Sequence, residues 1–163
     1  MIWSIAGGVE LDSLLSGLVG GLLGAFIGAG VTIWAQAVEH RHQGEIAARA
    51  VHAEAAANSA GVRLLLKGGA LHSFGMSAWE LRAADVARIL PADDFYNVAR
   101  AYTLIPECRA ILERAKARTP VSLKPAEQEM LEGILPSLTR ANDILRKAAW
   151  KKGKAPTLGG LAS

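Results

Sequence analysis

The chain has 163 residues, a formal net charge of +3 and a single cysteine, Cys108. One cysteine excludes an internal disulfide and fits a reducing compartment. The four histidines are scattered without a cysteine pair or closely spaced ligands, which argues against a metal site. No phosphate loop, H-E-x-x-H or G-x-S-x-G motif occurs, so we expect neither an enzyme nor a cofactor.

An uncharged run over residues 13–38 dominates the N-terminal part of the chain. As a helix, the stretch from Leu14 to Trp34 is about 31 Å long, which matches the hydrocarbon core of a bilayer. Trp34 lies where an interfacial aromatic side chain is expected. The sequence predicts a transmembrane helix over residues 13–38, after a short extracytoplasmic N-terminus over residues 1–12.

The alternative to an anchor is a cleaved signal peptide, because Ala35-Gln36-Ala37 is similar to a small-residue cleavage site. Against it, Glu10 and Asp12 precede the run, no lysine or arginine does, and the run is longer than a typical signal-peptide core. All 18 lysines and arginines lie at or after Arg41. The positive-inside rule therefore predicts a single-pass protein of the inner (cytoplasmic) membrane, with its N-terminus outside and its C-terminal domain in the cytoplasm.

Small residues occupy one face of the predicted span. Glycine is common in membrane helices, but overlapping pairs spaced four apart on one face favour close helix association. We therefore expect a homo-oligomer in membrane lipid. The predicted association residues are Gly17, Gly20, Gly21, Gly24, Gly28 and Thr32.

The chain after the span is rich in Ala, Leu, Arg and Glu, without strand-like alternation. We expect an all-α fold in which the transmembrane helix continues into a cytosolic four-helix bundle over residues 39–152. A disordered basic tail is expected over residues 153–163.

The first cytosolic helix is predicted from Glu39 to about Lys67, ending at Gly68. Its predicted inner seam has the alternating four and three spacing of helices that pack on another helix, within the bundle or on a second chain. One turn apart, Glu54 and Asn58 either hydrogen-bond across the bundle or form a surface pair. The seam consists of Ile46, Ala50, Ala53, Ala57, Ala60 and Leu64.

Three further helices are predicted. Ser77 and Glu80 match a capping box, so the second helix is expected from Ala78 to Pro91. The third is expected to begin between Pro91 and Asp93 and to end at Thr119-Pro120, with a kink at Pro106. The fourth begins at Pro125 and bends at Pro136. The predicted core residues of the last two helices are Phe95, Val98, Tyr102, Ile105, Leu112, Leu131, Ile134, Leu135, Leu138, Ala141, Leu145 and Ala148.

A basic cluster with one aromatic residue lies near the end of the fourth predicted helix. If the helices alternate in direction, this end returns to the membrane, where anionic lipid attracts each basic residue by about 1 kcal/mol. The alternative is a solvated helix end whose charges suit the helix dipole. The cluster is short, so nucleic acid is not expected as a partner. Its residues are Arg146, Lys147, Trp150, Lys151, Lys152 and Lys154.

The glycine-rich anchor, the segments VTIWAQAVEHRH and AEAAAN, and the stretch SAWE…LPADDFYNVARAY follow one another along the chain. This order resembles uncharacterised bacterial and phage single-pass membrane proteins with a cytosolic helical domain. The resemblance brings no catalytic residues.

Two functions from different classes fit these features. The preferred one is a scaffold or regulatory protein that self-associates through its anchor and presents the cytosolic domain to a protein partner. The alternative is a membrane-active effector, such as a holin-like lysis protein or a phage-defence toxin, in which Ser13, Ser16 and Thr32 line a wet path. A membrane-bound enzyme is the third possibility, and the sequence offers no site for it.

Overall fold

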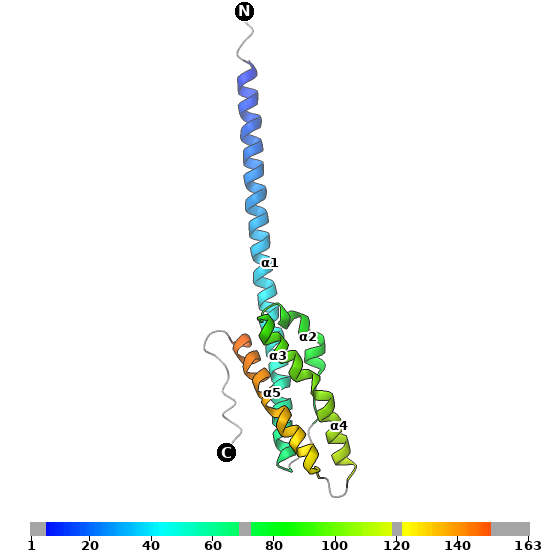
Figure 1. Ribbon diagram of the computed structural model, residues 1–163. Coiled ribbons are helices and arrows are strands. Elements are labelled where there is room, and N and C mark those ends of the chain that lie inside the picture. Colours follow the sequence, from blue (N-terminus) through cyan, green and yellow to red (C-terminus); the bar gives the residue numbers. More distant parts are fainter. Residues whose placement is uncertain (1–5, 69–72, 119–121, 151–163) are drawn as a thin grey trace, which may run out of the picture. The chain divides into compact units, whose positions relative to one another are not determined.

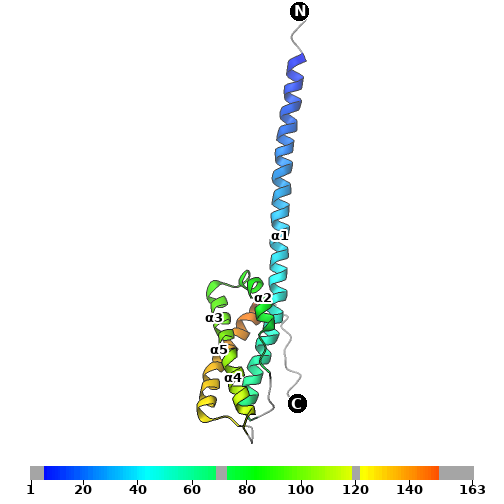
Figure 2. The same ribbon diagram turned by 90° about the vertical axis from the view of Figure 1, so that its right-hand side faces the viewer.

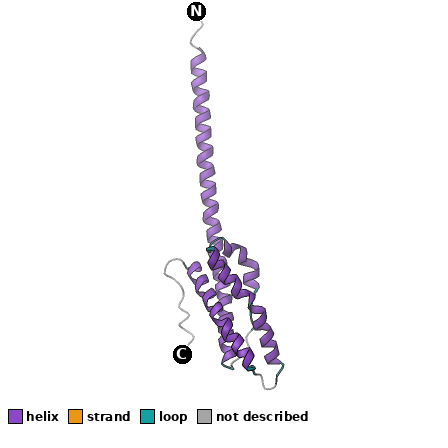
Figure 3. Cartoon of the chain, in the orientation of Figure 1, coloured by secondary structure: helices purple, strands orange, loops and turns teal. Residues whose placement is uncertain are grey.

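The computed structural model describes residues 6–68, 73–118 and 122–150, with side chains from residue 18 onward. All regular structure in these residues is helical (Figure 3), which confirms the all-α prediction. The chain divides into two compact units, Met1–Glu39 and His40–Ser163. Helix α1, Ala6–Leu66, contributes residues to both units.

In the first unit, α1 carries the uncharged run. Every described side chain of this unit is exposed, with Leu18, Phe26 and Trp34 at 63%, 75% and 69% of their maximal exposure. Among the described residues, α1 is the one helix that is long and apolar enough to cross a membrane, judged by length and composition alone. This agrees with the sequence-based expectation of one candidate span.

In the second unit, four helices pack with residues 40–66 of α1 around one apolar core (Figure 1). Helices α3 and α5 lie side by side and run in opposite directions, as both Figure 1 and Figure 2 show. The apolar positions predicted for the last two helices are buried or packed against this core. The four helices are α2 (Ser77–Ala87), α3 (Ala92–Thr103), α4 (Ile105–Lys116) and α5 (Pro125–Ala149).

The third predicted helix is in fact two helices. Helix α3 ends at Thr103, and α4 begins at Ile105 with Pro106 in its first turn. The Pro106 ring lacks an N–H group and would clash with the carbonyl four residues earlier, so the chain interrupts the helix instead of bending it. Four helices therefore follow α1, where the sequence predicted three.

The predicted seam of α1 does not face the core of the second unit, so its expected packing within the bundle is wrong. The side buried in the core carries Ala47, Val51, Ala55, Val62 and Leu65, each at most 5% exposed. Alanine occurs on both faces of this helix, and the larger apolar area of Val51 and Val62 favours burial of their face. The exposed residues are those of the predicted seam, namely Ile46, Ala50, Ala53, Ala57, Ala60 and Leu64.

Some of the predicted helix ends are confirmed and others are wrong, among them the end of α2, which lies at Ala87 and not at Pro91. Gly68 follows the end of α1 with a φ of +69°, the left-handed conformation expected of a C-terminal glycine. Helix α5 begins at Pro125 as predicted. The capping box at Ser77 does not form: Met76 is the N-cap residue of α2 and makes no side-chain capping bond. The expected helix end at Thr119-Pro120 and the tail over residues 153–163 lie outside the described residues.

Candidate functional surfaces

The glycine face of the first unit is open in the single chain. A Cβ atom added at Gly20, Gly21, Gly24 or Gly28 would meet no atom within 4 Å. The Thr32 hydroxyl donates a hydrogen bond to the Gly28 carbonyl oxygen at 2.9 Å, so its polarity is satisfied within the helix. The surroundings of Gly17 lie outside the described side chains.

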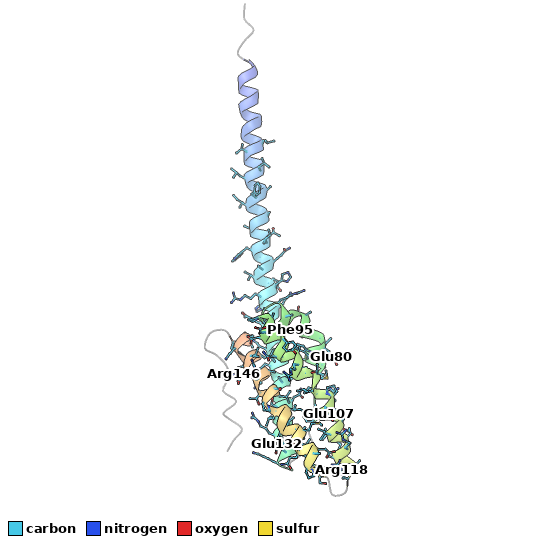
Figure 4. All side chains as sticks on the ribbon, in the orientation of Figure 1. Glu80, Phe95, Glu107, Arg118, Glu132 and Arg146 are labelled. Carbon is cyan, nitrogen blue, oxygen red and sulfur yellow. The ribbon has the colours of Figure 1, made fainter. Side chains whose placement is uncertain are left out.

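The last turns of α5 hold the described part of the basic cluster. Arg146, labelled in Figure 4, forms an ion pair with Asp143 at 3.3 Å, with both side chains about half exposed. Lys147 is exposed, and Trp150 follows the last residue of α5. The other three basic residues of the cluster, Lys151, Lys152 and Lys154, lie outside the described residues.

Trp150 is not a free aromatic side chain, because it packs against α1. Its ring meets the His52 ring edge-on, with centroids 5.0 Å apart. Nearby, Arg49 Nε donates a hydrogen bond to the Ala149 carbonyl oxygen at 3.3 Å. Burial, and then the positive charge of Arg146, lower the pKa of His52, while Asp143 opposes them. Burial against Trp150 therefore favours the neutral form of the His52 ring.

Glu54 and Asn58 both bond across the second unit, which was one of the two alternatives left open by the sequence. The Glu54 carboxylate accepts hydrogen bonds from the N–H groups of Ala78 at 2.9 Å and Trp79 at 3.2 Å. It thereby caps the N-terminus of α2, the role that the sequence assigned to Ser77. Asn58 makes two hydrogen bonds with the backbone of Gly75.

A cluster of ionic side chains joins the end of α4 to the start of α5 and was not anticipated from the sequence. Arg118 Nη2 lies 2.6 Å from Glu127 Oε1 (Arg118 is labelled in Figure 4). Arg114 also donates to Glu127, at 3.3 Å, and the Lys124 N–H donates to the same carboxylate at 2.9 Å. The Arg118 hydrogen bonds, followed by the backbone bond from Lys124, lower the pKa of Glu127 to about 2. The donors to Glu127 come from the end of α4 and the start of α5, so the cluster ties these two helix ends together.

The described side chains show no arrangement typical of catalysis. Among these residues, no group of three or more His, Cys, Asp or Glu side chains is placed to hold a metal ion. Cys108 is fully buried, and burial raises the pKa of its thiol to about 11. A protonated, inaccessible thiol is a poor nucleophile.

A hollow of about 740 Å³ forms an open groove along α5. Its lining mixes both charge signs, from Asp94 and Glu132 to Arg140 and Lys147. Mixed charges of this kind are typical of the polar rim of a protein contact.

The chain matches no family model, no curated protein and no solved structure. Its function is therefore argued from its own surfaces.

Proposed function

We propose that this protein is a single-pass, membrane-anchored scaffold or regulatory protein. The observation that carries the proposal is the exposure of the apolar residues of α1, which reaches 75% at Phe26 and 66% at Ile27. A continuous apolar surface of this length is unfavourable in water and favourable in lipid, where a helix satisfies its own backbone. The positive-inside rule orients the second unit toward the cytoplasm.

The anchoring and orientation are tested with Leu81→Cys in the full chain. Leu81 is 79% exposed, whereas the native Cys108 is fully buried. A membrane-impermeant maleimide should label Leu81→Cys only after the cells are permeabilised, and the protein should stay in the membrane during alkaline extraction. Labelling of intact cells would contradict the orientation, and extraction into the alkaline supernatant would contradict the anchor.

Self-association through the glycine face is the second part of the proposal. Because no atom of the single chain lies near a Cβ added at Gly24 or Gly28, leucine at both positions is tolerated by the helix itself. The double Gly→Leu variant should reduce energy transfer between labelled copies in bacterial membranes at least several-fold. The matched control is Ile27→Leu with Ile33→Leu, which leaves the glycine face intact. Equal energy transfer in both variants would contradict association through this face.

The basic end of α5 is proposed to contact anionic lipid. Lys147→Cys carries a fluorescent label, and the full chain is reconstituted in nanodiscs with a lipid-borne quencher. Quenching should be stronger in anionic than in zwitterionic nanodiscs, and stronger than for a label at Leu81→Cys. Equal quenching at the two positions would favour a solvated helix end.

The open small-residue face also favours the effector alternative, because small-residue faces support higher oligomers. Induced expression with a potential-sensitive dye separates the two functions. Cells that stay polarised with the protein inserted support the scaffold. Depolarisation by the wild type, but not by the double Gly→Leu variant, would replace the scaffold with a membrane-permeabilising effector.

A further inference from the structure

The exposed face of α1 in the second unit is apolar and regularly spaced. Ile46 and Leu64 are each 46% exposed, and the residues between them on this face are all alanine. Their spacing alternates between four and three, the spacing of a helix that packs against another helix. Among the described residues, no helix covers this face. The exposed seam is defined as Ile46, Ala50, Ala53, Ala57, Ala60 and Leu64.

An apolar groove of about 500 Å³ runs beside the exposed seam. Ala53, Ala57 and Ala60 of the seam line it together with Ala56, and Trp150 closes one side. Small residues leave hollows into which the side chains of a closely approaching helix fit. The groove therefore suits a helix, and its apolar lining favours an apolar helix face.

We infer that the exposed seam binds the same seam of a second copy of this chain, with the two helices parallel. The inference rests on the proposed function, because it requires two copies anchored in one membrane. Three residues of the seam, Ile46, Ala53 and Ala60, follow Thr32 by two, three and four heptads. Thr32 ends the series of small residues through which the anchors are proposed to associate. A second copy of this chain carries the same heptad spacing along both the anchor and the exposed seam. It is therefore the partner that matches both stretches.

The charges beside the seam favour the parallel orientation. On one side, Arg49 and Arg63 are two heptads apart, and they donate to Ala149 and Thr139 of α5. On the other side, at the flanking heptad position, lies Glu54. In a parallel pair each arginine side faces the side of the other copy that carries Glu54, whose carboxylate is bonded to the start of α2, so the arginines of the two copies stay apart. In an antiparallel pair, Arg49 of each copy would face Arg63 of the other copy, and these like charges would repel.

The seam is too short and too rich in alanine to support a tight dimer between free chains. Alanine buries little apolar area, and a stable interface usually buries about 800 Å² on each partner. Anchoring changes this balance, because chains already joined at one interface form the second at a high effective concentration. The seam is therefore expected to add to association only within the membrane.

Disulfide formation between copies that carry one added cysteine tests the inference in the full chain in membranes. Under mild oxidation, Ile46→Cys and Leu64→Cys should each form a covalent dimer through the same residue of two copies, since a disulfide requires Cα atoms within about 7 Å. The exposed Leu81→Cys should form at least several-fold less covalent dimer. The wild type, with buried Cys108, should form no covalent dimer. Dimers that appear only when both seam cysteines are present would indicate an antiparallel pair and overturn the inference. A disulfide to a different protein would also overturn it.

A second pair of measurements separates this inference from association of the anchors. Ala25→Cys reports contact on the small-residue face of the span, and Leu64→Cys reports contact at the seam. Dimers of Ala25→Cys without dimers of Leu64→Cys leave the proposed function standing and overturn the seam. Dimers of Leu64→Cys that are lost with Ala57→Arg, while Ala25→Cys dimers persist, support the seam. An unchanged thermal unfolding of Ala57→Arg in detergent shows that the exposed substitution leaves the fold intact.

Discussion

Asn58 and Gly75 exchange two hydrogen bonds: the Asn58 amide donates to the Gly75 carbonyl oxygen at 2.8 Å, and the Gly75 N–H donates to Asn58 Oδ1 at 2.9 Å. Asn58 is 1% exposed and Gly75 is half-buried, so both bonds are partly shielded from water. They join the helix α1 to the segment that leads into α2, and satisfy backbone groups that belong to no helix. Loss of such a hydrogen bond destabilises the fold most when it leaves a buried partner unsatisfied.

Asn58→Ala is therefore expected to lower the free energy of unfolding by about 1–3 kcal/mol, because the Gly75 N–H and carbonyl groups lose their partners. Urea unfolding of the full chain in detergent, followed by circular dichroism, measures the change. Gln128→Ala is the control, since Gln128 makes an exposed hydrogen bond to Glu132. Equal midpoints for the two variants would mean that water replaces the Asn58 amide without cost.

Glu54→Ala should destabilise the protein by about 1–2 kcal/mol, the usual cost of losing a helix cap. Ser77→Ala should cost less than about 0.5 kcal/mol, because an exposed hydrogen bond contributes little. The Ser77 hydroxyl makes one exposed contact of 3.4 Å to Glu54. The same unfolding measurement decides between the caps: a larger effect of Ser77→Ala would restore the capping box predicted from the sequence.

Two helical glycines are expected to respond to alanine with opposite signs. A Cβ at Gly44 would lie 2.3 Å from Ile89 Cγ2 and 3.2 Å from the Asp85 carbonyl oxygen, so Gly44→Ala should destabilise by about 1–3 kcal/mol through overpacking. A Cβ at Gly133 of α5 would meet nothing within 4 Å. Gly133→Ala should stabilise by about 0.5–1 kcal/mol, because alanine has the higher helix propensity. Thermal unfolding of both variants is the measurement, and shifts of the same sign would show that α1 and α2 do not meet at Gly44.

Acid should weaken the protein through Glu127. Its pKa falls from 4.5 to about 2 on folding, so its contribution to stability is complete above the higher value and is lost as the pH falls toward the lower. Between about pH 5 and pH 2, the urea midpoint of the wild type should fall as the pH is lowered. In Glu127→Gln this fall should be smaller. The control is Glu129→Gln, at an exposed position two residues away. A decline as steep in Glu127→Gln as in the wild type would contradict the role of the Arg118 hydrogen bonds.

Local patterns were sufficient to predict where most helices lie. The apolar residues of α5 recur every three or four positions with polar residues between them, so one face was identifiable without a structure. The stop at Gly68 and the start at Pro125 depend on the backbone properties of single residues. The uncharged run identified a candidate span because its length and composition are properties of one segment.

The positions that tertiary structure decided are those where the local pattern permits two answers. Alanine covers both faces of α1, so its spacing alone did not show that the face of Val51 and Val62 turns to the core and leaves the Ile46–Leu64 seam exposed. Ser77 was a reasonable cap by sequence, but Glu54, more than twenty residues away, reaches the same N–H groups. Likewise, Arg118 and Glu127 meet only because the fold brings the end of α4 close to the start of α5. Periodicity and capping rules describe a single helix, whereas burial, caps from another helix and ion pairs depend on which segments the fold brings together.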